Sequence, residues 1–366
     1  MTVGYYAPLP PARTGVAHYA AALLDTLRKH ARIRVNRPGE INLYHIGNNP
    51  LHGEIYRRAL EVPGVVILHD AVLNHLLLGM LSEEEYLAEF VYNYGAWWTD
   101  AARKLWRERA RSAADPRYFQ RPLLKRIAGR SRAVIVHNPG AAEMVRQHAP
   151  ETPVYEVPHL YQPKPAPPWS EIYEFRRRFG IPPGAFLFGV FGHLRESKRL
   201  WSVFEALGSV RGAELLLAGD FASSDLKHAA GPVLESPSGV HWTGYLSEAE
   251  FELCAHAVEA CINLKHPAAG ETSGIAIRLM GAGKPVLLTA CVENSRFPDD
   301  VCIRVDSGPA EASMLAEFMS WLAANPARAR EMGRRAREYV LTRHDVELSA
   351  KAIFEVVCTA AGVAAR

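Results

Sequence analysis

The sequence predicts an α/β protein with two doubly wound, parallel-sheet domains. Short apolar segments alternate with longer helical patterns, and four strand-then-helix units occur in the first half of the 366 residues. A stiff segment with four prolines in nine residues, at 161–169, divides the chain. We therefore expect an N-terminal domain over 1–162, a linker over 163–172, a C-terminal domain over 173–345 and a final helical segment over 346–366.

Composition indicates a soluble globular protein, with 48% hydrophobic and 22% charged residues. No run reaches about 18 apolar residues, and the start lacks the pattern of a secretory signal. A net charge of +3 is too small to predict nucleic-acid binding by the whole chain. Five cysteines without a Cys-x-x-Cys pair disfavour a zinc site or a disulfide framework and favour the cytoplasm; they are Cys254, Cys261, Cys291, Cys302 and Cys358.

Two arginine-rich stretches, 103–111 and 328–337, contain apolar residues at helical spacing. A solvated helix face explains both of them. The first stretch has a second interpretation, which is contact with anionic lipid headgroups or with lipid-linked acceptors. Peripheral contact with the inner membrane surface therefore stays open.

The first domain begins with a strand over 3–7, a loop over 8–16 and a helix over about 17–30. Gly15 and Val16 would offer backbone N–H groups at the helix start, where an anion binds well. A plain surface turn explains the same loop. No Gly-x-Gly-x-x-Gly follows a predicted strand, which disfavours a hydride-transferring dinucleotide enzyme.

Polar residues follow the next two strands, at the edge where open α/β sheets bind ligands. Asn48, after the strand over 41–46, is either a turn former or a binder of acceptor hydroxyls. His69 and Asp70 follow the apolar strand over 65–68. His69 is the best candidate for a functional side chain in this half, although a lone histidine is usually structural.

Helical patterns rich in aromatic residues and arginine fill 82–128. We expect most of these aromatic rings in the core or between helices, with a minority lining an acceptor groove. Strands over 132–136 and 154–157 complete the first sheet.

The second domain opens with a strand over 185–191, followed by a loop with cations before a helix. Lys198 and Arg199 lie where the helix dipole disfavours positive charge, and this position favours a bound anion such as a diphosphate. His193, when protonated, is a further candidate for that charge. Three more strands are predicted over 214–218, 240–246 and 257–264.

The segment 265–288 combines a polar turn, a helix and a strand. Thr272 or Ser273 can cap the helix, and Gly274 lets a ligand approach the free N–H groups of its first turn. Glu271 stands beside the turn, where its carboxylate could accept hydrogen bonds from the hydroxyls of a phosphate-bearing sugar. A capped helix with a favourably placed glutamate explains these residues without any ligand.

The turn Gly-Glu-Thr-Ser-Gly, its helix and the closing Gly-Lys-Pro-Val resemble the donor-binding signature of family 4 retaining glycosyltransferases. That family has the GT-B fold, in which two Rossmann-like, doubly wound domains face a central cleft. The resemblance spans nearly the whole chain and is strongest over 185–287. The family usually has a second glutamate, eight residues after the first, that holds the nucleotide ribose. Leu279 occupies that position here, after Arg278, and the spacing resembles a bacterial branch that has an arginine there.

The resemblance implies roles for the residues singled out above. It places His69 against the donor sugar and Gly15 against the diphosphate. Lys198, helped by Arg199, would hold the departing diphosphate, and Glu271 would orient sugar hydroxyls; His69, Glu271 and Lys198 are the predicted catalytic set. The predicted donor-binding set is Gly15, Val16, His193, Lys198, Arg199, Trp242, Tyr245, Glu271, Ser273, Gly274 and Ile275, and the predicted acceptor-binding set is Arg13, Asn48 and Asp70.

Within these sets, Trp242 or Tyr245 could stack on the nucleobase, and either could equally belong to the core. The implied activity is that of a hexosyltransferase, which moves a sugar from a nucleoside-diphosphate sugar to a glycan or lipid-linked acceptor with retention, in polysaccharide biosynthesis. No metal or other cofactor is expected, because cations and a helix dipole would stabilise the leaving group. A nucleotide-sugar epimerase of the same fold and a catalytically silent sugar-nucleotide-binding protein remain open alternatives.

Overall fold

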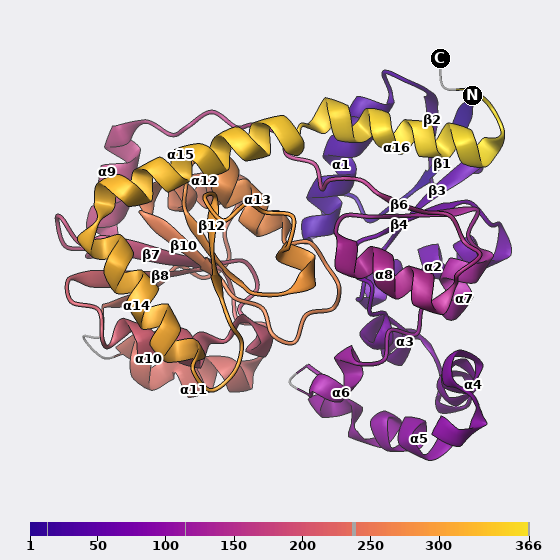
Figure 1. The fold of residues 1–366 in the computed structure, drawn as a ribbon, viewed down its shortest axis with the longest axis horizontal. Helices are drawn as coiled ribbons and strands as arrows, with labels where there is room; N and C mark the ends of the chain where they lie inside the picture. The colour runs from indigo at the N-terminus through magenta and orange to yellow at the C-terminus, as the bar shows by residue number, and fades with distance from the viewer. Residues whose placement is uncertain (13, 114, 236–238, 365–366) are drawn as a thin grey trace. The chain divides into compact units, whose positions relative to one another are not determined.

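The structure is a computed structural model that describes residues 1–12, 14–113, 115–235 and 239–364. It contains two six-stranded sheets, and every described strand pair in them is parallel (Figure 1). Helices connect most successive strands that pair in parallel, whereas β2 leads to β3 through a short loop, because both of these strands pair with β1. The α/β class and the two doubly wound sheets predicted from the sequence are confirmed.

The chain forms two compact units. Unit 1 comprises residues 1–162, 267–272 and 344–366, and unit 2 comprises 163–266 and 273–343. The short segment 267–272 therefore packs with unit 1 although both of its flanks belong to unit 2.

The sheet of unit 1 has the strand order β2-β1-β3-β4-β5-β6. Its three central strands β3, β4 and β5 are fully buried, because helices cover both faces of the sheet. The strands are β1 (Thr2–Tyr6), β2 (Arg32–Val35), β3 (Ile41–Ile46), β4 (Val65–Leu68), β5 (Ala133–Val136) and β6 (Val154–Glu156).

Two hydrophobic clusters hold helices against this sheet. In one, Tyr19 and Leu23 of helix α1 pack with Ile353 and Val357 of helix α16; the other contains α2, α3 and a helical insert made of α4 to α7. None of the described helices is long and apolar enough to cross a membrane. The helices are α1 (Gly15–Leu27), α2 (Gly53–Glu61), α3 (Asn74–Met80), α4 (Glu83–Tyr94), α5 (Thr99–Glu108), α6 (Pro116–Phe119), α7 (Lys125–Arg130), α8 (Pro139–His148) and α16 (Val346–Ala361).

The sheet of unit 2 has the order β12-β11-β10-β7-β8-β9, around one large apolar cluster. Its strands are β7 (Phe186–Phe191), β8 (Ala213–Ala218), β9 (Val240–Trp242), β10 (Ala260–Asn263), β11 (Val286–Thr289) and β12 (Cys302–Val305). Its helices are α9 (Trp169–Arg178), α10 (Leu200–Leu207), α11 (Ser224–Glu235), α12 (Glu248–Ala257), α13 (Gly274–Gly281), α14 (Glu311–Ala324) and α15 (Pro326–Arg343).

The structure also differs from the sequence-based expectations in places. The sequence analysis missed β2 and β12, which are four-residue edge strands with an arginine in place of a continuous apolar run. It also did not predict α11, a helix that contains Pro232. The first helix starts at Gly15 instead of residue 17, because the Thr14 hydroxyl caps it by accepting a hydrogen bond from the Val16 N–H.

Candidate functional site

The strand order of unit 2 reverses between β7 and β10. The chain runs from β7 outward through β8 to β9 and then resumes with β10 on the other side of β7. Ligands of open α/β sheets bind outside the carboxyl ends of the strands at such a reversal. The loops that leave these two strands meet there, where the His266 N–H donates a hydrogen bond to the Ser197 carbonyl at 2.8 Å.

Asn263, the last residue of β10, links the two loops through its side chain. Its Nδ2 donates to the Ser273 hydroxyl at 2.9 Å, and its Oδ1 accepts a longer hydrogen bond from Lys198 Nζ at 3.5 Å. The Ser273 hydroxyl accepts from the Ala276 N–H at 3.2 Å and so caps α13. One amide side chain therefore holds a lysine and the start of a helix together.

Helix α13 begins at Gly274, and the backbone N–H groups of Gly274 and Ile275 lie in its first turn. They precede the first backbone hydrogen bond of this eight-residue helix, which runs from the Ile277 N–H to the Ser273 carbonyl at 3.2 Å. The positive end of the helix dipole lies at these groups, so they favour an anion, and the ammonium of Lys198 favours the same charge.

Two glycines let the loop after β7 approach this helix start. Gly192 has φ +86°, and a Cβ built on it would lie 2.3 Å from Cδ1 of Ile275. Gly219 has φ +150°, and a Cβ there would lie 2.1 Å from the carbonyl oxygen of Gly192. Both positions exclude a side chain, so the backbone after β7 packs directly against the first turn of α13.

Lys198 is half-buried. Burial, followed by the positive charges of Lys265 and Arg195, lowers the pKa of Lys198 to about 7. Among the described residues its ammonium is in no ion pair. A bound anion would favour the protonated lysine, so the site has positive charge available for a ligand.

Arg199 and His193 do not resemble Lys198 in their surroundings. Arg199 adopts φ +57° before α10, and its Nε donates to Glu311 Oε1 at 2.7 Å. Glu311 is only 1% exposed and also accepts from the Ser202 hydroxyl at 2.6 Å. The charge of Arg199 thus already compensates a buried carboxylate, whereas His193 is exposed on the loop.

The two aromatic candidates for base stacking differ in accessibility. The indole N–H of Trp242 donates to the Gly219 carbonyl at 2.8 Å, and its ring packs against Phe221 with centroids 5.4 Å apart. Tyr245, in the loop after β9, is 53% exposed. Tyr245 is therefore the more accessible ring.

Glu271 belongs to the segment 267–272, which is anchored in unit 1. Two successive backbone N–H groups after β4 donate to the Ala269 carbonyl at 2.8 and 2.9 Å. Asn138, after β5, donates to the Gly270 carbonyl at 3.1 Å and to the Thr272 hydroxyl at 3.0 Å. Glu271 Oε2 accepts from the Ala269 N–H at 2.6 Å, which fixes the carboxylate in this turn.

The position of the family's second glutamate lies inside the fold. Leu279 is fully buried. Arg278 forms ion pairs with Glu248 at 3.0 Å and Glu252 at 2.7 Å, and it covers the ring of Phe251 at 3.6 Å. Position 279 therefore points a side chain into the core.

Histidines gather at the carboxyl edge of the sheet of unit 1, around Tyr19 of α1. The rings of His69, His137 and His159 lie 4.8, 5.2 and 4.8 Å from that of Tyr19, between centroids. His45 Nδ1 lies 3.0 Å from His69 Nε2, at hydrogen-bond distance. The described residues nevertheless contain no group of three or more His, Cys, Asp or Glu that could hold a metal ion.

These histidines are neutral at physiological pH. Burial, followed by repulsion from neighbouring histidines, holds the pKa of His45, His69 and His159 well below the usual value. Burial lowers the pKa of His137 to about 4. In the neutral pair His45 and His69, one ring donates a hydrogen bond and the other accepts it, so the tautomers of the two rings depend on each other.

The start of α1 leaves room beside Gly15. The Thr14 hydroxyl accepts from the Val16 N–H at 3.4 Å, and a Cβ built on Gly15 would meet no atom within 4 Å. The packing of the chain therefore gives no reason for a glycine at this position.

The predicted acceptor residues serve mainly to brace loops. Asn48 Oδ1 accepts from the Leu76 N–H at 3.0 Å, and the Asn48 N–H donates to Asp70 Oδ2 at 2.8 Å. These bonds connect the loops after β3 and β4. They occupy the side-chain amide oxygen of Asn48 and one carboxylate oxygen of Asp70. Arg13 lies outside the described residues.

Several residues at the carboxyl edges of the two sheets, each considered within its own unit, were not singled out by the sequence analysis. Asn263 and Lys265 lie beside the loop after β7 because β10 pairs with β7. Tyr19, His45 and His137 come together only through the strand order of unit 1. The recurrence of a histidine near the ends of successive strands was the available signal.

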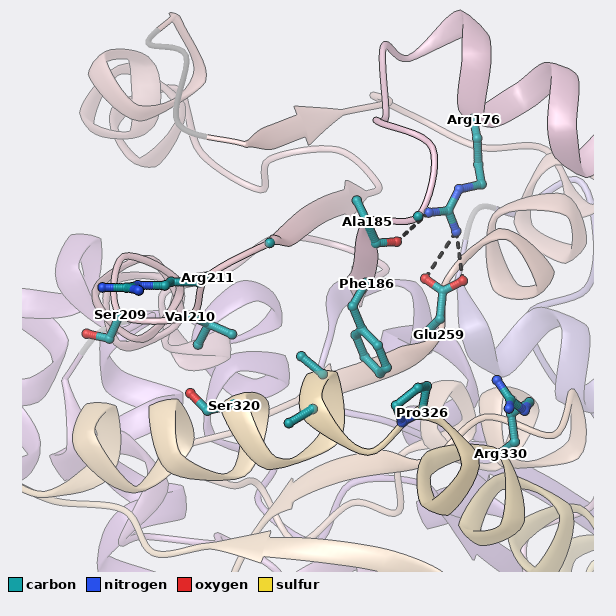
Figure 2. Close-up of a pocket in the computed structure, with 14 residues that line it drawn as sticks. Arg176, Ala185, Phe186, Ser209, Val210, Arg211, Glu259, Ser320, Pro326 and Arg330 are labelled. Atoms are coloured by element: carbon teal, nitrogen blue, oxygen red, sulfur yellow. Dashed lines mark hydrogen bonds and ion pairs between the residues drawn. The ribbon is translucent and has the colours of Figure 1, made fainter.

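A pocket of about 680 Å³ lies at the opposite edge of the sheet of unit 2 (Figure 2). Phe186 starts β7 and Glu259 directly precedes β10, so the pocket adjoins the amino ends of these strands. There Arg176 donates to Glu259 at 2.8 Å and to the Ala185 carbonyl at 2.7 Å. These bonds pin α9 to the sheet. We place the functional site at the carboxyl edge, because the loops of the chain reversal, the cation and the helix start converge there.

Comparison with solved structures identifies the fold. The chain superposes on HepE (Alr3699) of Anabaena in complex with UDP-glucose with a TM-score of 0.67 and 15% identity, covering 98% of this chain and 100% of that one. Sucrose-phosphate synthase from Thermosynechococcus elongatus superposes with a TM-score of 0.69 and 15% identity, covering 98% of each chain. WaaG, a glycosyltransferase involved in lipopolysaccharide biosynthesis, superposes with a TM-score of 0.60 and 15% identity, covering 98% of this chain and 99% of that one. The chain has the GT-B fold. Neither a protein-family model nor a curated protein sequence matches it.

The histidine cluster predicts that acid destabilises unit 1. A histidine in the unfolded chain has a pKa near 6.5, whereas the buried ones resist protonation. The free energy of unfolding should therefore be highest above about pH 6.5 and should fall as the pH falls towards 4, by roughly 1 kcal/mol per pH unit for each buried histidine. Calorimetry between about pH 7.5 and 5 should show a falling Tm.

His137→Gln should weaken this pH dependence, because it removes one titrating group. His228→Gln is the matched control, since His228 is exposed in unit 2. A constant Tm across this pH range, or equal slopes in the two variants, would contradict the interpretation.

Proposed function

We propose that this chain is a retaining hexosyltransferase of glycosyltransferase family 4 that needs no metal ion. It would transfer a sugar from a nucleoside-diphosphate sugar to an acceptor hydroxyl, in cytoplasmic glycan or polysaccharide biosynthesis. The observation that carries the proposal is the link from Lys198 through Asn263 to Ser273, which puts an ammonium and a capped helix start at one sheet edge.

Charge development explains why such a transferase needs this arrangement. As the bond between the anomeric carbon and the diphosphate oxygen breaks, negative charge grows on the leaving group. Preorganised donors stabilise that charge without reorganising during the reaction. Here the donors would be the N–H groups of Gly274 and Ile275 and the Lys198 ammonium, with Lys265 adding to the positive potential.

The sugar would be oriented by neutral and acidic groups of unit 1. His69 is neutral and lies at hydrogen-bond distance from His45, so it could exchange a hydrogen bond with a sugar hydroxyl without adding charge. Glu271 would accept hydrogen bonds from other hydroxyls. Following the family, the acceptor hydroxyl would attack the anomeric carbon on the face that the diphosphate leaves, with no carboxylate nucleophile.

UDP-sugars are the first donors to test, because HepE was crystallised with UDP-glucose. The acceptor is proposed to be a glycan or a lipid-linked saccharide. Leu279 cannot hold a ribose, so base and ribose selection would rest on the loop after β9, where Tyr245 is exposed.

Incubation with UDP-sugars should separate the candidate activities. We expect slow hydrolysis at most without an acceptor, and transfer with retained configuration, detected by proton NMR, when an acceptor panel is added. Interconversion of the sugar without an acceptor would identify an epimerase. Binding without turnover across the panel would identify a silent nucleotide-sugar-binding protein.

Lys198→Ala should weaken UDP binding by roughly 10- to 100-fold, because a hydrogen bond to a charged group contributes about 1.5 to 3 kcal/mol. The thermal shift produced by UDP should shrink accordingly. Arg211→Ala is the control, since it removes a cation that lines the opposite pocket. An unchanged shift in Lys198→Ala, or a loss in Arg211→Ala, would mean that the diphosphate binds elsewhere.

Gly15→Ala should leave the Tm unchanged, because the new methyl group meets no atom of the protein within 4 Å. If the donor lies against this helix start, the methyl should occupy that space and weaken donor binding by about tenfold, on the order of 1 to 3 kcal/mol for overpacking. Gly129→Ala provides a matched control in the same unit, since its Cβ also meets nothing. Equal donor affinity in both variants would remove Gly15 from the site.

A further inference from the structure

The helical insert of unit 1 exposes large aromatic side chains close together in the sequence. Trp97 is 94% exposed, Tyr92 44% and Trp98 36%. They lie at the end of α4 and in the 3-10 turn Ala96–Trp98 before α5. Figure 1 shows α4, α5 and α6 as a group that projects from the rest of unit 1.

The folding of the insert does not require these exposed rings. Its interior is filled by other side chains: Tyr86, Phe90, Leu105 and Tyr118 are buried in the cluster beneath the sheet. Trp97 contributes almost no buried area, and leaving so large an apolar ring in water is unfavourable. An interaction outside the unit would account for its position.

Cations lie over two of these rings, those of Trp98 and Tyr92. The guanidinium of Arg121 lies 4.4 Å from the ring centre of Trp98, and the ammonium of Lys125 lies 5.1 Å from that of Tyr92. The Lys125 N–H donates to Asn93 Oδ1 at 2.9 Å, which ties the start of α7 to the end of α4. Aromatic and cationic groups therefore share one continuous surface.

Helix α5 extends this surface. Its inner face holds Ala102 and Leu105, and at helical spacing its outer face holds Lys104 and Arg107. The neighbouring Arg103 pairs with Asp100 at 2.8 Å. Within the described residues, four cations of the surface form no ion pair; they are Lys104, Arg107, Arg121 and Lys125.

We propose that this surface docks on a lipid bilayer with anionic headgroups. Tryptophan rings partition into the headgroup region, and each lysine or arginine near an anionic membrane adds to binding. Trp97 stands almost free of its own protein at the start of α5 and would enter the bilayer interface. The four cations of the surface that form no ion pair among the described residues complement phosphate groups.

This docking surface makes the open expectation of membrane contact specific, and it does not depend on sugar transfer. It would hold the enzyme where a lipid-linked acceptor is presented. Donor turnover measured without vesicles tests the proposed function separately, so either proposal can fail alone.

Co-sedimentation should show binding to phosphatidylcholine vesicles with about 30% phosphatidylglycerol and little binding to phosphatidylcholine alone. Trp97→Ala should weaken binding about fivefold. The double variant Lys104→Glu/Arg107→Glu should weaken it at least about 20-fold. High salt should release the wild-type protein.

Trp169→Ala and Arg328→Glu are matched controls in unit 2, because Trp169 is 83% exposed and Arg328 is exposed. They should leave vesicle binding within about twofold of wild type, and unchanged melting should show that all variants fold. Equal binding to neutral and anionic vesicles, equal loss in the control variants, or binding of a soluble acidic oligosaccharide without vesicle binding would overturn the proposal.

Discussion

The side chain of Asn263 joins the parts of unit 2 on which a phosphate site depends. One end of its amide holds the Ser273 hydroxyl that caps α13, and the other contacts the Lys198 ammonium. Because Asn263 ends a buried central strand, its position is set by the sheet instead of by a loop. The adjacent cations then divide into two kinds. Arg199 compensates the buried Glu311 and serves the fold, whereas Lys198 keeps a pKa of about 7 among other cations and is available to an anion.

Unit 1 offers a different chemistry at the carboxyl edge of its sheet. Its histidines lie ring against ring and are neutral, so they present hydrogen-bonding groups without net charge. The segment that carries Glu271 is pinned to the loops after β4 and β5 by four hydrogen bonds. In the proposed transfer reaction, positive charge is needed where the diphosphate departs, and neutral or acidic groups suit the hydroxyls of a sugar.

The sequence predicted the features that depend on neighbouring residues, namely strands and the starts of helices. The short apolar runs 65–68 and 185–191 predicted strands that the structure contains as β4 and β7, and the glycine and hydroxyl residues at 272–274 predicted the start of α13. What the sequence could not predict depends on contacts between distant residues. Glu311, which binds Arg199, lies 112 positions away. The place of Asn263 beside Lys198 depends on β10 pairing with β7, which no local pattern encodes.

A crystal structure of the protein with UDP would test the central claim most directly. The account predicts that the diphosphate oxygens lie within hydrogen-bond distance of the N–H groups of Gly274 and Ile275 and of Lys198 Nζ. Diphosphate density at any other place, such as the pocket beside Arg176 and Arg330, would contradict it.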